Sequence, residues 1–120
     1  MTQCVSATLS RTKAVVAARV EVAASLPQRM KGLLGRPALE AGAGLFLPAC
    51  RSIHTCGMRF SLDVIFLTRQ GQVVAALKSL PPWRISPLIW RAWGVLELPD
   101  GTVERHNVLV GDQLELRELP

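Results

Sequence analysis

The fold is decided by the stretch Phe60-Ser61-Leu62-Asp63-Val64-Ile65-Phe66-Leu67. Side chains of an extended chain alternate between two faces, and both sets are mostly apolar here, which predicts a strand buried among apolar neighbours. Asp63 falls inside this strand. A carboxylate is costly to remove from water, so the folded protein must supply it with hydrogen-bond donors or admit water. The stretch therefore predicts a buried strand that carries one polar group in need of partners.

Other short strands follow from the same kind of pattern. Apolar and polar residues alternate over 16–22, which predicts a strand with one wet face. Turn-forming residues such as Asp100-Gly101 and Gly111-Asp112 separate further apolar runs. The remaining strands are predicted at residues 45–47, 51–55, 60–67, 72–78, 93–98 and 113–117.

A single clear helix is predicted at residues 26–34. Ser25 has the character of an N-cap, apolar residues recur at helical spacing after it, and Gly35 can end the helix. Several short strands with so little helix predict a mainly β fold. We expect a compact antiparallel β-sandwich or barrel-like domain with one or two short helices.

Length and composition favour one domain. The chain has 120 residues, of which 49% are hydrophobic, enough for a core without disulfide or metal support. Residues 1–13 are mostly polar and are predicted to form an N-terminal arm that is loosely ordered or an edge strand. Residues 14–120 are predicted to form the single domain.

Charge and targeting signals exclude some classes of protein. The net charge is +5, but the 14 basic residues are scattered and form no run, which argues against specific nucleic-acid binding. No apolar stretch is long enough to span a membrane. Cys4, Cys50 and Cys56 lack CxxC spacing, which favours a reducing compartment. We therefore expect a cytoplasmic protein without a cofactor, although an exported form with its signal removed would look the same.

Two kinds of chemistry are open to the residues just before the buried strand. His54 and Cys56 project to the same side of an extended chain and could bind a metal ion, with Asp63 as a third ligand. The same three types could form a nucleophile, a base and an orienting acid if the backbone bends at Gly57. Two ligands at this spacing are a weak signal, and no tightly bound zinc is expected. No catalytic residue and no metal ligand is assigned.

A second acid repeats the pattern of Asp63. Glu97 lies within the apolar run Val95-Leu96-Glu97-Leu98 and also needs a partner if it is buried. The cations available to these two acids are His54, Arg36, Arg51 and Arg59.

Together these motifs resemble the DUF192 family, small bacterial and archaeal domains without an assigned biochemical function. The resemblance covers about residues 19–117 and rests on Arg29, Gly32-Leu33-Leu34-Gly35-Arg36, Gly44-Leu45-Phe46, Ile53-His54-Thr55, Met58, residues 60–67 and 95–98, Gly101 and Gly111-Asp112. It implies a compact β-sandwich or barrel with short helices and no accepted catalytic residues. It also implies that Cys56 occupies a variable position, while the recurring positions are His54, Thr55, Met58, Asp63 and Glu97.

These observations lead to one main expectation and one alternative. We expect a small β-domain in which His54, Asp63 and Glu97 form one hydrogen-bonded cluster, with Thr55, Met58 and Arg36 near it. The cluster would either lock the fold or line a pocket for a small ligand. The alternative is an enzyme or a metal-binding protein that uses the same residues and possibly Cys56.

The segment 79–91 is the one long irregular stretch. It contains three prolines together with the apolar residues Trp83, Ile85, Leu88, Ile89 and Trp90, too much apolar surface to leave in water. One hypothesis is a lid beside His54 and Asp63, with Arg84 or Arg91 pairing with a carboxylate or an anionic ligand. The other is a cover for a distant sheet edge. Through this segment the protein could bind a small molecule or another protein.

Overall fold

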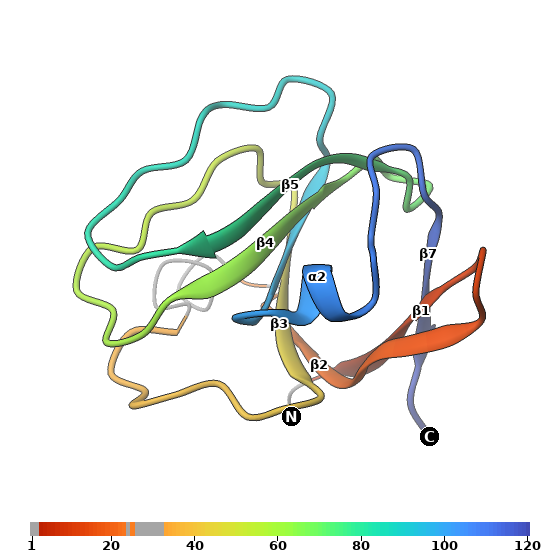
Figure 1. Cartoon of the computed structure of the whole chain (residues 1–120), viewed down its shortest axis with the longest axis horizontal. Helices are drawn as coiled ribbons and strands as arrows, with labels where there is room; N and C mark the ends of the chain where they lie inside the picture. Colours follow the sequence, from red (N-terminus) through yellow and green to blue (C-terminus); the bar gives the residue numbers. More distant parts are fainter. Residues whose placement is uncertain (1–2, 24, 26–32) are drawn as a thin grey trace.

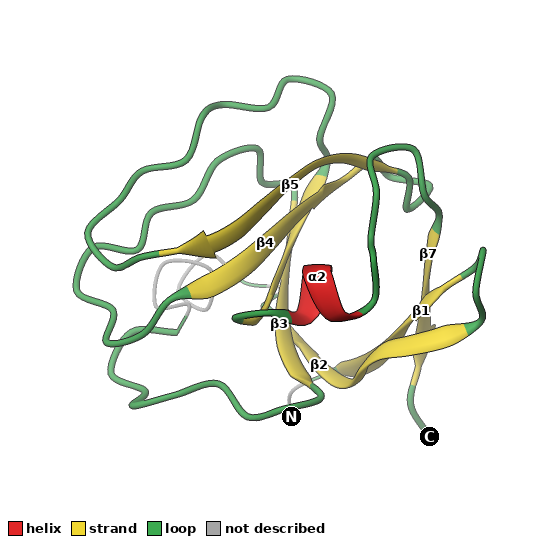
Figure 2. Ribbon diagram, in the orientation of Figure 1, coloured by secondary structure: helices red, strands yellow, loops and turns green. Residues whose placement is uncertain are grey.

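In the part of the chain that the structure describes, seven strands form one curled sheet around one short helix (Figure 1 and Figure 2). The computed structural model describes residues 3–23, 25 and 33–120. The strand order is β5-β4-β6-β3-β2-β1-β7, and the neighbours are antiparallel except for the parallel pair β2 and β3. The elements are β1 Cys4–Leu9, β2 Ala14–Val22, β3 Ala43–Pro48, β4 Leu62–Leu67, β5 Val73–Leu80, β6 Gly94–Pro99, α2 Thr102–Arg105 and β7 Leu114–Glu118. The prediction of a mainly β, barrel-like fold is confirmed.

The curl brings the two edge strands of the sheet together at one end. The backbone N–H of Val73 donates to the carbonyl oxygen of Asp112 (2.8 Å), and that of Leu114 donates to the carbonyl of Gly71 (2.9 Å). Gly71 has a φ of +91°, and a Cβ atom there would overlap the Leu114 carbonyl. This close approach therefore requires glycine. It joins β5 to β7 and holds the sheet as a half-barrel.

Apolar cores lie on both faces of the central strands. Ile65 and Leu67 of β4 belong to one core, which also contains Val103 of α2, and α2 lies inside the curl (Figure 2). Val64 and Phe66, the alternate residues of β4, belong to a second core on the opposite face. All six residues of β4 are buried. The prediction that this strand is buried on both sides is confirmed.

The N-terminal segment differs from the expected arm or edge strand. Cys4–Leu9 forms β1, which lies inside the sheet between β2 and β7. Val5, Ala7 and Leu9 are buried in the core. The partner strand β7 comes from the other end of the chain, so local sequence could not reveal this pairing.

One further predicted strand is absent from the sheet, and the predicted helix cannot be compared with the described residues. Residues 51–55 do not form a strand of the sheet, and only His54 makes an isolated bridge, with Ile85. This stretch instead pairs with the segment 81–91. The predicted helix at 26–34 lies almost wholly outside the described residues. The short helix α2, Thr102–Arg105, was not predicted.

Among the described residues, no helix is long and apolar enough to cross a membrane.

Candidate functional site

Asp63 is buried and fully partnered by backbone groups. Its exposed fraction is 0%. The backbone N–H of Ser79 donates to Oδ1 (2.9 Å), and the backbone N–H of Val103 donates to Oδ2 (2.8 Å). Ser79 lies near the end of β5, and Val103 lies in the first turn of α2. The carboxylate thus ties two elements to β4, which is a structural task.

Glu97 is buried on the opposite face of the same sheet. It pairs in register with Leu45 on β3 and with Val64 on β4, so its side chain shares their face. Asp63 is the neighbour of Val64 in β4 and points the other way. Burial raises the pKa of Glu97 to about 7. The prediction of one hydrogen-bonded cluster of His54, Asp63 and Glu97 is therefore wrong, because the sheet separates the two acids.

His54 lies at the surface, and its ring is held by its own segment. The backbone N–H of Cys56 donates to Nδ1 of His54 (3.2 Å). That nitrogen is therefore engaged by backbone rather than by the Cys56 thiol, and the Asp63 carboxylate receives its donors elsewhere. The nucleophile, base and acid considered from the sequence are not assembled. Within residues 3–23, 25 and 33–120, no three His, Cys, Asp or Glu side chains gather as a candidate metal site.

Thr55 fastens the segment 81–91 to the body of the protein. Its hydroxyl group donates to the carbonyl oxygen of Pro81 (2.6 Å) and accepts the backbone N–H of Arg84 (2.9 Å). The backbone N–H of Thr55 donates to the Arg84 carbonyl (2.8 Å), and the N–H of Trp83 donates to the Thr55 carbonyl (3.0 Å). Thr55 is completely buried. One side chain thus satisfies backbone groups at two positions of the segment.

The pairing continues along both segments. The backbone N–H of Ser86 donates to the carbonyl of Ile53 (2.8 Å), and the Ser86 hydroxyl accepts the N–H of Ile53 (2.9 Å). Farther along, the N–H of Ile89 donates to the carbonyl of Arg51 (2.9 Å). We call residues 51–56 and 81–91 the paired loops. The segment therefore lies beside His54, as one hypothesis expected, but that hypothesis also placed it beside Asp63, whose oxygens accept from Ser79 and Val103 instead.

We expect Thr55→Val to loosen the paired loops. The substitution keeps the shape but removes the hydroxyl group, which leaves the Arg84 N–H without its acceptor and should cost about 1–3 kcal/mol. Hydrogen–deuterium exchange should rise at residues 83–86, and urea unfolding should show the loss of stability. Thr55→Ser, which retains the hydroxyl, is the control. Equal exchange in the two variants would contradict this role.

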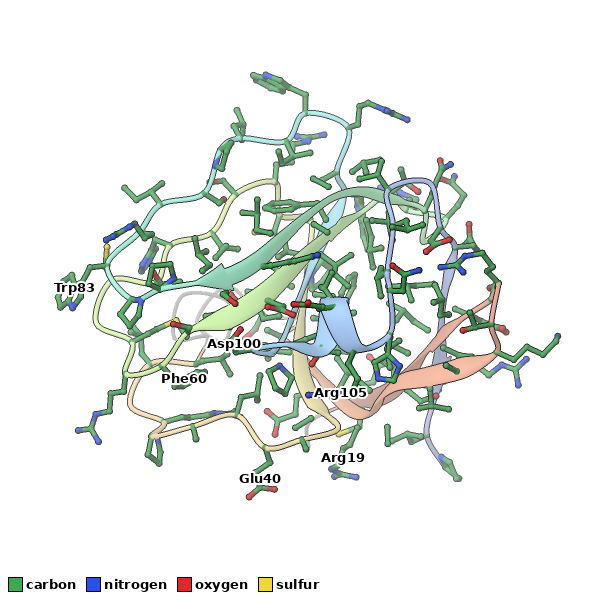
Figure 3. All side chains as sticks on the ribbon, viewed as in Figure 1. Arg19, Glu40, Phe60, Trp83, Asp100 and Arg105 are labelled. Carbon is green, nitrogen blue, oxygen red and sulfur yellow. The ribbon has the colours of Figure 1, made fainter. Side chains whose placement is uncertain are left out.

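The large apolar side chains of segment 81–91 remain largely in solvent. Trp83, Ile85, Leu88 and Trp90 are 68%, 76%, 50% and 75% exposed. The expectation that folding back would bury the apolar side chains is wrong for these four, whereas Ile89 is half-buried and packs against the second core. Figure 3 shows Trp83 projecting from the edge of the molecule. Ile85 also lines a shallow hollow of about 460 Å³ with Ser52, Ile53, His54 and Cys56.

The charged side chains of the paired loops have one sign. From residue 41 to residue 99 the only acids are Asp63 and Glu97, and both are buried. The same stretch carries six exposed cations, which are Arg51, Arg59, Arg69, Lys78, Arg84 and Arg91. The guanidinium group of Arg84 donates to the Trp83 carbonyl and not to either acid. An anionic group at the paired loops would therefore meet the positive side chains of Arg51, Arg84 and Arg91.

We call eight of the exposed residues of the paired loops the cationic apolar face: Arg51, His54, Trp83, Arg84, Ile85, Leu88, Trp90 and Arg91. Of the residues predicted for a site, His54 alone belongs to it. Met58 is buried in the second core, and Arg36 forms an ion pair with Glu21 (2.9 Å). The remaining predicted residues are the buried Thr55, Asp63 and Glu97. The face could have been suspected from the lack of further acids between residues 41 and 99.

Comparisons with known proteins agree with this fold. The model of the family DUF192, described as "Uncharacterized ACR", matches residues 7–116. A UPF0127 protein of Thermococcus sibiricus is 32% identical over 112 residues, which cover 89% of this chain and 72% of the relative. Another UPF0127 protein, from Pyrococcus furiosus, is 42% identical over 64 residues, which cover 53% of this chain and 54% of the relative.

Two solved structures share the fold. A protein of unknown function from Novosphingobium aromaticivorans has a TM-score of 0.80 at 24% identity, with 93% of this chain and 83% of that chain covered. A protein from Sinorhizobium meliloti, proposed as a transcription regulator, has a TM-score of 0.79 at 24% identity, with 97% and 94% covered. At this identity the likeness concerns the fold alone.

Proposed function

We propose that this chain, which belongs to the DUF192 family, is a binding domain that uses the cationic apolar face to hold ligands combining an apolar group with a negative charge. One observation carries the proposal. Trp83, Ile85, Leu88 and Trp90 stay exposed on a segment whose backbone is fixed by hydrogen bonds to residues 51–56. Large exposed apolar patches on soluble surfaces usually mark interaction sites. The surrounding arginines select an anionic partner.

Binding is favoured over catalysis by the positions of the reactive groups. Each oxygen of the buried Asp63 accepts one backbone N–H, and Nδ1 of His54 accepts the backbone N–H of Cys56. A nucleophile needs a base within hydrogen-bond reach, and this arrangement directs the groups elsewhere. The shallow hollow beside Ile85 offers an apolar floor rather than a set of convergent reactive groups.

Nucleic acid is a weaker candidate for the anionic partner. Regulation of transcription is suggested only for the Sinorhizobium meliloti protein. Trp83 and Trp90 could stack on bases, as in proteins that bind single strands. Ile85 and Leu88, however, are aliphatic and 76% and 50% exposed, and they offer no stacking surface. A hydrocarbon chain of a ligand can make favourable apolar contacts with all four side chains.

A fluorescence titration with two soluble amphiphiles tests this proposal. Decanoate and decyltrimethylammonium have the same chain and opposite charges, and both are used below their micelle concentrations. We expect saturable binding of decanoate with a blue shift of tryptophan emission, because Trp83 and Trp90 leave water. The cationic amphiphile should bind about tenfold more weakly, since each charge contact near a surface contributes up to about 1 kcal/mol.

The double variant Arg84→Glu with Arg91→Glu should lose the preference for decanoate. Its matched control is Arg105→Glu, which changes an exposed cation on α2, away from Trp83 (Figure 3). Equal binding of both amphiphiles to the unmodified protein would contradict the role of charge. No saturable response to either would contradict the proposed function itself.

A further inference from the structure

We infer that the cationic apolar face docks onto the surface of an anionic lipid bilayer. This inference rests on the proposed function and names the source of its ligand chemistry: lipid headgroups supply the negative charge and acyl chains supply the apolar medium. The protein would lie on the membrane through side chains of the paired loops. No part of the described chain would need to span it.

The shape of the cationic apolar face suits a bilayer surface. The segment 81–91 runs along the outer rim of the molecule in Figure 1, and Trp83 points outward from that rim in Figure 3. Its apolar side chains stand on a projecting loop, and the hollow beside Ile85 is shallow and open. Projecting apolar side chains suit insertion into a deformable medium. A concave groove with buried anchors would suit a folded protein or a peptide helix better.

The side chains of the face are of the types found where a bilayer meets water. Trp83 and Trp90 have amphipathic indole rings, the kind enriched where a bilayer meets water. Ile85 and Leu88 are purely aliphatic and gain from contact with acyl chains. Arg84 and Arg91 directly follow the two tryptophans in sequence. Their long stems can lie along the apolar layer while their guanidinium groups bind phosphate oxygens.

The backbone of the segment is partly satisfied by hydrogen bonds within the protein. The N–H groups of Trp83, Arg84, Ser86 and Ile89 all donate to partners in residues 51–55. Irregular loops are excluded from lipid when their backbone groups have no partners, because each unsatisfied group is costly there. The pairing of the two loops removes this cost at these four positions, which favours an approach of the segment to the bilayer surface.

The charge of the paired loops also favours an anionic surface. Both acids between residues 41 and 99 are buried, so the cationic apolar face itself carries no exposed carboxylate. Its charged side chains are Arg51, Arg84 and Arg91. An anionic bilayer would attract these side chains.

Sedimentation with vesicles tests the inference. The unmodified protein is mixed with vesicles of phosphatidylcholine alone or of phosphatidylcholine with phosphatidylglycerol, and the bound fraction and tryptophan emission are measured. We expect binding with a blue shift on the mixed vesicles, and binding at least about tenfold weaker on phosphatidylcholine alone. Lipids brominated along the acyl chain should quench the shifted emission. Equal partition into both kinds of vesicle would overturn the role of lipid charge.

Matched variants separate the face from general stickiness. Trp83→Ser with Trp90→Ser, and separately Arg84→Glu with Arg91→Glu, should each weaken binding about tenfold or more. Leu109→Ser with Val110→Ser is the apolar control, because those side chains are 51% and 66% exposed outside the paired loops. Arg105→Glu is the charge control. Loss of binding in the controls to the same degree would overturn the assignment to this face.

The soluble amphiphiles distinguish the proposed ligand binding from the inferred membrane docking. Saturable decanoate binding without vesicle binding would overturn the membrane inference and leave the proposed function standing. Failure of both would remove both. A single-stranded oligonucleotide that displaces the protein from mixed vesicles, and binds more tightly than they do, would overturn the inference in favour of nucleic acid.

Discussion

Asp63→Ala is expected to lower the free energy of unfolding by about 3–4 kcal/mol. The substitution removes the acceptor of two backbone N–H groups, those of Ser79 and Val103, at a site that is 0% exposed. A buried donor left without a partner costs about 1–3 kcal/mol, and bonds to charged acceptors are at the upper end of the range. Urea unfolding followed by circular dichroism measures the change.

Asp100→Ala is the matched control for that prediction. Its carboxylate also binds Ser79, but through the hydroxyl group (2.5 Å) and at an exposed position. Exposed polar contacts contribute little, so we expect a loss below about 1 kcal/mol. If Asp63→Ala costs no more than Asp100→Ala, the two backbone groups must have found other partners, and Asp63 would not be the link between β4, β5 and α2.

The behaviour of β4 could be predicted from sequence, but the partners of Asp63 could not. Apolar residues at both parities of 60–67 indicate a strand buried on both faces, and β4 is such a strand. The need of Asp63 for donors follows from the cost of burying a carboxylate. The donors themselves are main-chain groups of Ser79 and Val103, far along the chain. Every residue except proline carries such a group, so no side-chain pattern marks it.

The separation of the two acids shows how strongly strand register limits inference from sequence. Asp63 and Glu97 lie in similar apolar runs, which suggested a shared site. In the sheet Val64, not Asp63, is opposite Glu97, so the two carboxyl groups point to opposite faces. A shift of one residue in the register of β4 and β6 would have placed the two carboxyl groups on the same face. Register is set by all the pairings of β4 and β6 together, and a single sequence does not display them.

The tryptophans of the paired loops are exposed although their segment is rich in apolar residues. The apolar content of segment 81–91 led to the expectation of buried tryptophans, but Trp83 and Trp90 are exposed. Thr55 and Ser86 hold the segment through hydrogen bonds to the backbone. These hydrogen bonds fix the position of the segment although its tryptophans remain exposed. Sequence hydrophobicity alone does not distinguish a side chain that fills a core from one held at the surface by such anchors.

Glu97→Gln is expected to change the pH dependence of stability more than the substitution of an exposed acid such as Glu40. Burial raises the pKa of Glu97 from 4.5 to about 7. Between these values the unfolded chain releases the proton while the folded chain keeps it, so the stability of the unmodified protein falls as pH rises. The contribution of protonated Glu97 to stability is complete below pH 4.5 and is lost above about pH 7. The total is about 3 kcal/mol, because one pKa unit corresponds to about 1.4 kcal/mol.

Glutamine is neutral at every pH and has nearly the same shape, so the variant should lack this decline. We expect similar stability of the two proteins near pH 4 and an advantage of about 3 kcal/mol for Glu97→Gln near pH 8, measured by urea unfolding at each pH. Glu40→Gln, which changes an exposed carboxylate, should retain the decline seen in the unmodified protein. Parallel profiles for Glu97→Gln and the unmodified protein would show that burial does not raise the pKa. A carbon NMR titration of the Glu97 carboxyl group gives an independent reading, since its midpoint should lie near pH 7 in the folded protein.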